Sequence, residues 1–301
     1  MRINRGIIEV TAAGALLGTA GTGAALMPSG SDPVLSGLWR LILGAIALLL
    51  VVAVRDRGLS SHMKLLRIPA LWVMAATAAY YQPTFFMATS LTGVGAATLV
   101  AVGSMPIFAG IVSRTVYKTS LHRAWYLATA LSTVGLLFTS FGTAKHLDVI
   151  GLLLALSTGL STGIYVNAVR GVFRTHDDPI AITAFAFVLG SIASLPVLVA
   201  KWDASIFSGS SLLVIIYLGV VTMAVANALQ IQGMKRVSPA IAAVLLLADP
   251  LTANILGITV LGESADALRI VGMLLVAAGL VVAGSANASD GQESEPVVLA
   301  G

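Results

Sequence analysis

The sequence contains no cysteine and very few charged residues. Without cysteine the chain forms no disulfide and offers no thiol for catalysis. Charged residues make up 10% of the 301 positions, whereas an average soluble domain carries about a quarter. Hydrophobic residues make up 57%. This balance is typical of a protein that lies within a lipid bilayer.

Enzyme signatures are also missing. No G-x-S-x-G, P-loop, H-E-x-x-H or dinucleotide-binding pattern occurs. The four histidines fall in predicted loops without the spacing of metal ligands. We therefore expect no enzymatic activity, no cofactor and no metal site. A membrane-embedded enzyme would need acids or histidines clustered at headgroup level. The basic residues flank apolar runs and form no patch with interleaved aromatics, so nucleic acid is not a predicted partner.

Long uncharged runs occupy most of the chain. A helix of about 20 residues crosses about 30 Å of hydrocarbon, and the runs accommodate ten such segments. The sequence therefore predicts an all-α integral membrane protein with ten transmembrane helices. Their expected ranges are 6–27, 34–54, 67–89, 93–114, 124–143, 149–170, 179–200, 211–233, 238–261 and 267–285.

The distribution of lysine and arginine predicts the orientation. Placing the N-terminus in the cytoplasm puts most of the basic residues on that side, as the positive-inside rule requires. Both termini are then cytoplasmic. We expect the first apolar run to be a retained helix rather than a cleaved signal peptide. The polar, acidic tail at 286–301 is predicted to be disordered.

The sequence also repeats itself. Asp32-Pro33 with LILGAIALL at 41–49 matches Asp178-Pro179 with FVLGSIASL at 187–195, at an offset of 146. Residues 94–142 align without a gap to 238–286 at an offset of 144, which places Pro106 on Pro250. The expected repeats are 1–145 and 146–285.

Each repeat holds five predicted helices, and this odd number forces the second copy to enter the membrane upside down. The loop at 115–123 is basic, whereas the equivalent loop at 262–266 is acidic. Two inverted five-helix repeats are the mark of secondary transporters, in which two halves rock about a site at the middle of the membrane. A small-molecule substrate and the lipid bilayer are the predicted partners, and we expect the chain to work as a monomer.

The pattern resembles the drug/metabolite transporter superfamily and its EamA-like members. The resemblance rests on the two five-helix repeats, on the proline-bearing helices, and on the turn Leu261-Gly262-Glu263. Within that superfamily, the run AAYYQPTFFMATSLTGVGAATL at 78–99 is most similar to bacterial aromatic amino acid exporters. The resemblance implies export of small metabolites across the bacterial inner membrane by alternating access. The start GALLGTAGTGAALMP at 14–28 departs from the family's usual Trp and Asn.

Asp249 is the clearest candidate for a functional residue. It lies at the midpoint of the span 238–261, beside Pro250. An ionised carboxylate at this depth costs about 3 kcal/mol and normally faces protein or a water-filled cavity. Three roles remain open: binding a substrate ammonium, carrying a coupling proton, or capping backbone freed by Pro250. The equivalent Pro106 stands beside Met105, so the predicted hinge-like kink is common to both repeats and the charge is not.

Polar and aromatic residues on spans three and eight are candidates for substrate binding. Tyr80 and Thr84 share one helix face, while Tyr81 lies about 100° away, so both tyrosines cannot point into one cavity. Tyrosine rings suit an aromatic amino acid because they stack and offer a hydroxyl. On span eight, Asn227 and Gln230 form a polar face that predicts either cavity lining or interhelical hydrogen bonding. The predicted substrate-binding residues are Tyr80, Tyr81, Gln82, Thr84, Met105, Tyr165, Asn227, Gln230 and Asp249.

Further candidates lie nearer the membrane surfaces. Glu9 follows Arg5 by four residues and is either a surface ion-pair partner or a second proton carrier. Trp39 and Arg40 are expected at the outer start of span two, where interfacial anchoring explains both and a gate role for Trp39 is an alternative. Gly14 and Gly18 are expected to let helices pack closely. The predicted substrate is an aromatic amino acid; drugs, other amino acids and nucleotide sugars are the alternatives.

Overall fold

The computed structural model describes residues 4–27, 31–140, 148–203 and 210–293. The first half of the chain forms five long helices. A short 3-10 helix, η1 (Ser60–Arg67), separates the second from the third. The long helices are α1 (Arg5–Ala25), α2 (Pro33–Arg55), α3 (Pro69–Thr92), α4 (Val94–Thr115) and α5 (Arg123–Thr139).

The second half contains two irregular spans. One consists of α8 (Ser210–Tyr217), a π-helix η3 (Leu218–Val225) and α9 (Ala226–Gly233). The other consists of α10 (Pro239–Leu245) and α11 (Ala248–Thr259). The remaining helices are α6 (Val149–Val172), α7 (Pro179–Ala200) and α12 (Ala267–Glu293).

The described residues thus form ten spans in two five-span halves, which confirms the predicted all-α membrane fold. Eight of the ten are long and apolar enough to cross a membrane by length and composition. The other two are α3 and α5, and α5 has only 17 residues. Helix α12 continues past Ser285 to Glu293, while the rest of the predicted tail, 294–301, lies outside the described residues.

The repeated Asp-Pro pairs explain where α2 and α7 begin. Asp32 caps α2 by accepting hydrogen bonds from two backbone N–H groups, and Pro33 follows at the first helical position. Asp178 and Pro179 do the same for α7. An aspartate satisfies donors that a helix start leaves unpaired, and proline there loses no hydrogen bond. The repeat seen in the sequence is therefore a repeated helix start.

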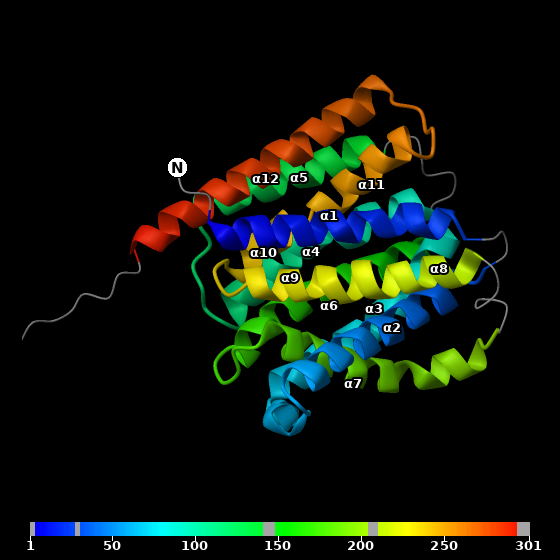
Figure 1. Ribbon diagram of the computed structural model, residues 1–301. Coiled ribbons are helices and arrows are strands. Elements are labelled where there is room, and N and C mark those ends of the chain that lie inside the picture. Colours follow the sequence, from blue (N-terminus) through cyan, green and yellow to red (C-terminus); the bar gives the residue numbers. More distant parts are fainter. Residues whose placement is uncertain (1–3, 28–30, 141–147, 204–209, 294–301) are drawn as a thin grey trace, which may run out of the picture.

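The two halves interlock through exchanged contacts. Helix α1 packs on α9 and α11 of the second half, while its counterpart α6 packs on α3 and α4 of the first. Helix α2 packs on its own counterpart α7, and α5 packs on α12. Figure 1 shows that α1 starts at the same end of the bundle at which α12 finishes. The pairs repeat because the halves are related by an inversion across the membrane.

Candidate functional site

The ninth span is broken next to Asp249. Helix α10 ends at Leu245, and the N–H of Asp249 donates to the carbonyl of Leu246 at 2.9 Å before α11 continues. Pro250 has no N–H to offer that carbonyl, so a tighter turn replaces the helical bond. By contrast, Pro106 lies inside the continuous helix α4. The two prolines were predicted to produce similar kinks, but Pro106 lies in a continuous helix and Pro250 lies next to a helix break.

Helix α1 holds the broken segment in place through two glycines. A side chain on Gly14 would lie 3.1 Å from the carbonyl oxygen of Leu246. One on Gly18 would collide with the carbonyl oxygen of Asp249. Small residues let helices approach this closely in a membrane. Close packing at both glycines, as the sequence predicts, thus fixes the position of Asp249.

Arg40 lies inside the bundle, which corrects the expectation that it anchors α2 at the membrane surface. The residue is partly buried, seven positions beyond the start of α2 at Pro33. Its guanidinium interacts electrostatically with the carboxylate of Asp249 and with Tyr81. The Nε of Arg40 finds no hydrogen-bond partner among the described residues. A charge this deep in a span needs a counter-charge, and Asp249 supplies it from the other half.

The π-helix η3 forms the wall beside Arg40. The Nη2 atom of Arg40 donates to the carbonyl of Thr222 at 3.5 Å. Helix α2 approaches this wall through Gly44, on which a side chain would lie 3.1 Å from the carbonyl oxygen of Gly219. Irregular backbone is tolerated at membrane depth where protein or a cavity covers it, and π-helical turns often occur at functional sites.

The two adjacent tyrosines of α3 point in different directions. Tyr81 interacts electrostatically with Arg40 and Asp249 and stacks on Phe85, with ring centroids 5.4 Å apart and planes at 12°. Tyr80 is 43% exposed, and its hydroxyl lies 2.9 Å from the Ser157 hydroxyl on α6. Tyr81 therefore joins the charged pair, and Tyr80 does not.

The structure places the other predicted substrate-binding residues in contacts within and between helices. Thr84 donates to the backbone carbonyl of Tyr80 at 2.5 Å and accepts from Thr158 at 3.3 Å. Asn227 donates to the carbonyl of Met223 in its own span at 2.9 Å. Three further residues are buried: Met105, Tyr165 and Gln230.

Gln82 is buried and, like Tyr165, holds a polar atom without a hydrogen-bond partner among the described residues. It is 1% exposed, and its Oε1 atom accepts no hydrogen bond from the described residues. That oxygen lies 2.9 Å from the position a side chain on Gly37 would take, so Gln82 faces α2 one turn before Arg40. Gln82 thus borders the charged pair.

The predicted gate and proton-carrier residues lie at opposite ends of the bundle. The ring of Trp39 packs edge-on against Trp202, with centroids 5.9 Å apart. Glu9 is 8% exposed and forms ion pairs with Arg5 at 2.8 Å and Arg236 at 3.4 Å. Because Arg236 belongs to the second half, Glu9 links the two halves rather than pairing only at the surface.

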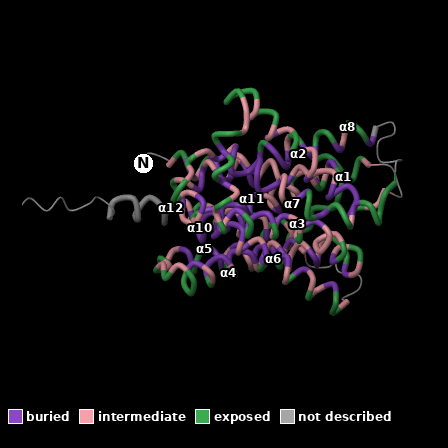
Figure 2. Tube along the Cα trace, turned by 90° about the horizontal axis from the view of Figure 1, so that it is seen from below, coloured by how far each residue is buried: buried purple, intermediate pink, exposed green. Residues whose placement is uncertain are grey.

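The exposure of the ninth span changes at Asp249. Every residue of α10 is buried, and Ala248 is still only 4% exposed. Asp249 itself is partly exposed, and most of α11 after it is partly or fully exposed. Buried residues accordingly follow the inner faces of the helices in Figure 2. Asp249 stands where the buried part of its span gives way to the more exposed part; the end of the bundle that contains α10 is called here the closed end.

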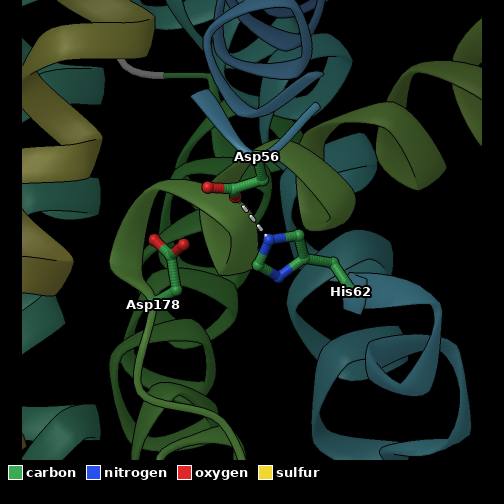
Figure 3. Close-up of side chains that lie close together, drawn as sticks. All are labelled: Asp56, His62 and Asp178. Atoms are coloured by element: carbon green, nitrogen blue, oxygen red, sulfur yellow. Dashed lines mark hydrogen bonds and ion pairs between the residues drawn. The ribbon is translucent and has the colours of Figure 1, made fainter. Parts of the chain in front are cut away.

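A second polar cluster, called here the histidine cluster, lies at the closed end. Figure 3 shows three of its members, Asp56, His62 and Asp178, which come from the end of α2, from η1 and from the start of α7. The Oδ2 atom of Asp56 lies 2.7 Å from Nε2 of His62. Nδ1 of His62 lies 3.0 Å from Nε2 of His176. Arg55 binds both carboxylates, of Asp56 and of Asp178.

The charges of the histidine cluster shift the pKa of its carboxyl groups. Burial alone would raise the pKa of Asp178, but hydrogen bonds from Arg55 and from the backbone at the start of α7 hold it below the usual value. Hydrogen bonds from Arg55 and His62 hold the pKa of Asp56 well below its usual range. Both groups therefore stay ionised at neutral pH.

Three donor atoms of the histidine cluster lie within 4.8 Å of one another, as a shared metal ion would require. The Arg55 guanidinium already bonds to both carboxylates, however, and Asp178 also caps α7. Since the site's cation is supplied by Arg55, the geometry favours a network of ion pairs and hydrogen bonds. Only His62 and His176 of the four histidines join it; His122 caps α5, and His146 lies outside the described residues.

The opposite end of the bundle carries a matching ion pair. Lys201 follows α7 as Arg55 ends α2, at the repeat offset of 146. Its Nζ atom lies 2.7 Å from Oδ2 of Asp32, which caps α2. The pairs Asp32–Lys201 and Asp178–Arg55 are thus related by the repeat, one at each end. Sequence analysis found the two aspartates but not their partners, because the partners lie 123 and 169 positions away.

These features define a class of protein. Two interlocked, inverted halves enclose broken and π-helical backbone and opposite charges within their spans, which is the architecture of a secondary transporter. A model of the EamA-like transporter family matches the chain twice, at residues 4–141 and 149–285. The protein belongs to this family, within the drug/metabolite transporter superfamily. It is a transporter and not an enzyme.

Individual relatives agree with this assignment. The chain is 34% identical over 271 residues to the "Uncharacterized transporter YwfM" of Bacillus subtilis, covering 89% of this chain and 90% of the relative. It is 29% identical over 138 residues to "Uncharacterized transporter YdfC" of the same species, covering 45% and 44%. A solved crystal structure that is 17% identical superposes with a TM-score of 0.75 over 95% of this chain and 98% of that one. This last likeness concerns the fold alone.

Proposed function

We propose that this transporter exports aromatic amino acids from the cytoplasm across the bacterial inner membrane. The observation that supports the proposal is the group formed by Arg40, Tyr81 and Asp249, which joins a cation, an aromatic hydroxyl and an anion. An amino acid presents a carboxylate, an ammonium and a side chain from one carbon atom. The three protein groups match these three features.

Each residue of the group has a distinct role in this proposal. The guanidinium of Arg40 binds the substrate carboxylate with paired N–H donors. Asp249 binds the ammonium, and the stacked rings of Tyr81 and Phe85 offer an aromatic surface to the substrate's ring. Gln82, whose Oε1 lacks a partner among the described residues, accepts a further hydrogen bond from the ammonium.

The same group suits alternating access. Arg40 belongs to the first half and Asp249 to the second, so a zwitterion bound between them contacts both. Without substrate, the two charges neutralise each other across the interface. Since no nucleotide-binding motif occurs, a gradient drives transport; Asp249 is the group through which a proton would be exchanged. In this proposal both termini lie in the cytoplasm, and one chain suffices for transport.

Transport assays with trimmed substrates test the proposal. Purified protein in liposomes is supplied with phenylalanine, phenylethylamine, which lacks the carboxylate, and phenylpropionate, which lacks the ammonium. Phenylalanine should move, and each trimmed compound should compete at least about tenfold more weakly, since a hydrogen bond to a charged group contributes about 1.5–3 kcal/mol. Threonine, a drug cation and a nucleotide sugar complete the panel. Transport of the nucleotide sugar without any amino acid would refute the substrate class.

The adjacent tyrosines supply a matched pair of variants. Tyr81→Ala should abolish phenylalanine transport, because it removes the aromatic ring that interacts with Arg40 and Asp249. Tyr80→Ala removes the same atoms one position away, where the ring is exposed and bonds to Ser157. Equal losses in the two variants would show that the ring of Tyr81 has no special part in recognition.

A further inference from the structure

Two imidazole rings from opposite halves of the protein meet at the closed end. His62 lies on η1 of the first half and His176 in the loop between α6 and α7 of the second. Their facing nitrogens are 3.0 Å apart, and the ring planes meet at 75°. His62 is 7% exposed. This contact ties η1 of the first half to the loop before α7 in the second half.

The contact accommodates a limited number of protons. The Nε2 atom of His62 faces the ionised carboxylate of Asp56 at 2.7 Å and therefore carries a hydrogen. Between the two rings, one nitrogen must donate and the other must accept. If both rings were charged, two N–H groups would face each other at 3.0 Å. The closed arrangement therefore excludes the doubly protonated pair.

The surrounding charges do not remove this restriction. Asp177 and Asp178 favour a charged His176, and Lys235 pairs with Asp177 at 2.9 Å. Burial of the ring, and then the charge of His62, nevertheless lower the pKa of His176 below its ordinary value. Arg55 faces the cluster from α2 and bonds to Asp56 and Asp178 rather than to either imidazole. His176 is thus the group whose proton binding the closed arrangement opposes.

If η1 separated from the loop between α6 and α7, His176 would bind a proton more easily. Once η1 moves away from the loop before α7, the ring of His176 leaves its contact with His62 and enters water, where an imidazole takes up a proton near pH 6.5. The separated arrangement then binds more protons than the closed one, so a fall in pH shifts the population toward separation. Acid favours separation rather than closure because the pKa of His176 is lowered in the closed arrangement.

We propose that His62 and His176 form a proton-sensitive latch, which holds η1 against the loop between α6 and α7 at neutral pH and releases them on acidification. The latch lies at the closed end, where α10 is buried and where Glu9 pairs with Arg236 across the halves. At the other end, the corresponding pair Asp32–Lys201 has no histidine among the described residues around it. Acid thus opens one end of the transporter selectively.

The absence of cysteine makes the test direct. A single cysteine replaces Ala181, which is 0% exposed in the first turn of α7, near η1. Its rate of modification by a maleimide is measured in nanodiscs at pH 7.5 and 5.5, without substrate. The rate is divided by that of Ser120→Cys, an exposed position, because pH also changes the reactivity of any thiol.

The latch predicts a several-fold rise of this ratio at pH 5.5. In the His176→Gln background, the amide still donates to His62 but does not titrate, so the ratio should stay the same at both pH values. His122→Gln removes a histidine that caps α5 away from the latch and should leave the rise intact. If His176→Gln fails to fold, His62→Gln takes its place.

A ratio that does not rise, or that rises equally in His176→Gln, overturns the latch. The measurement uses no substrate, so it stands apart from the proposed export of aromatic amino acids. A protein that carries another substrate can still pass this test, and an amino acid exporter can fail it.

Discussion

The two halves of this protein share one fold but differ at the residues closest to its centre. Helix α4 passes through Pro106 without interruption, whereas the equivalent span breaks between α10 and α11 beside Pro250. Helix α3 is a regular α-helix, whereas its counterpart contains the π-helix η3. Among the described spans, the broken and π-helical backbone lies in the second half.

The charges depart from the symmetry in the same way. At the repeat offsets, Arg40 corresponds to Ala186 and Asp249 to Met105. The inverted copy of the charged pair is therefore a pair of apolar residues. Duplication supplied two equivalent interfaces, and only one of them holds opposite charges. A symmetric scaffold can thus hold an asymmetric set of charges, as the proposed zwitterionic substrate would require.

The largest effect is expected from removing one charge of the pair formed by Arg40 and Asp249. Arg40→Gln and Asp249→Asn should each lower transport by about 10-fold to 100-fold, as expected when a charge-assisted hydrogen bond of about 1.5–3 kcal/mol is lost. The counterpart variant Met105→Leu keeps volume and polarity and should retain most of the rate. Initial rates in liposomes at matched protein content decide the comparison. Transport by Asp249→Asn at the unmodified rate would remove this residue from the site.

A smaller effect is expected at the glycines that position the helix break. A methyl group on Gly18 collides with the backbone of Asp249, so Gly18→Ala should lower the free energy of unfolding by about 1–3 kcal/mol, as overpacking does. Gly21 is the matched control, since a methyl group there meets no described atom within 4 Å. Gly21→Ala should leave stability unchanged or raise it by about 0.5–1 kcal/mol. Thermal unfolding in detergent measures both, and equal losses would contradict the role of Gly18.

The two prolines provide a test of the broken backbone. Pro250→Ala restores an N–H that can bond to the carbonyl of Leu246, so it should extend the helix across the break and slow transport several-fold. Pro106→Ala changes a position within a continuous helix and should alter the rate much less. Rates in liposomes report the difference. If both variants slow transport equally, the break has no function that α4 lacks.

The smallest effect is expected at the two ion pairs related by the repeat. Asp178→Asn and Asp32→Asn keep a capping oxygen but remove the charge, and each should cost less than about 1 kcal/mol because exposed ion pairs contribute little. Burial alone would raise the pKa of both aspartates in the folded protein, but their partner cations, together with backbone hydrogen bonds, lower it. Their contribution is therefore present above about pH 3.9 and is lost as pH falls through the lower folded values. Unfolding temperatures at pH 6 and pH 3 should show a smaller acid loss in the variants than in the parent protein.

Much of the fold could be predicted because it depends on local composition. The uncharged runs predicted nine of the ten spans to within a few residues, while α12 runs eight residues past its predicted end. The repeated Asp-Pro pairs marked the starts of α2 and α7. Asp249 stood out because a lone carboxylate in an apolar run needs a reason to be there. Arg40 was misplaced because it lies near the start of α2, where a surface anchor and an inward charge look the same in sequence.

The sequence by itself determined the membrane class, the number of spans and the inverted duplication, since each follows from hydrophobicity and periodicity along one chain. Only the tertiary structure decided that Arg40 and Asp249 lie within electrostatic reach of each other, that Tyr81 rather than Tyr80 interacts with both, and that His62 touches His176. These pairs join positions separated by a large part of the chain. Whether they meet depends on how helices rotate and pack, and the small residues that set this packing look alike in a linear sequence.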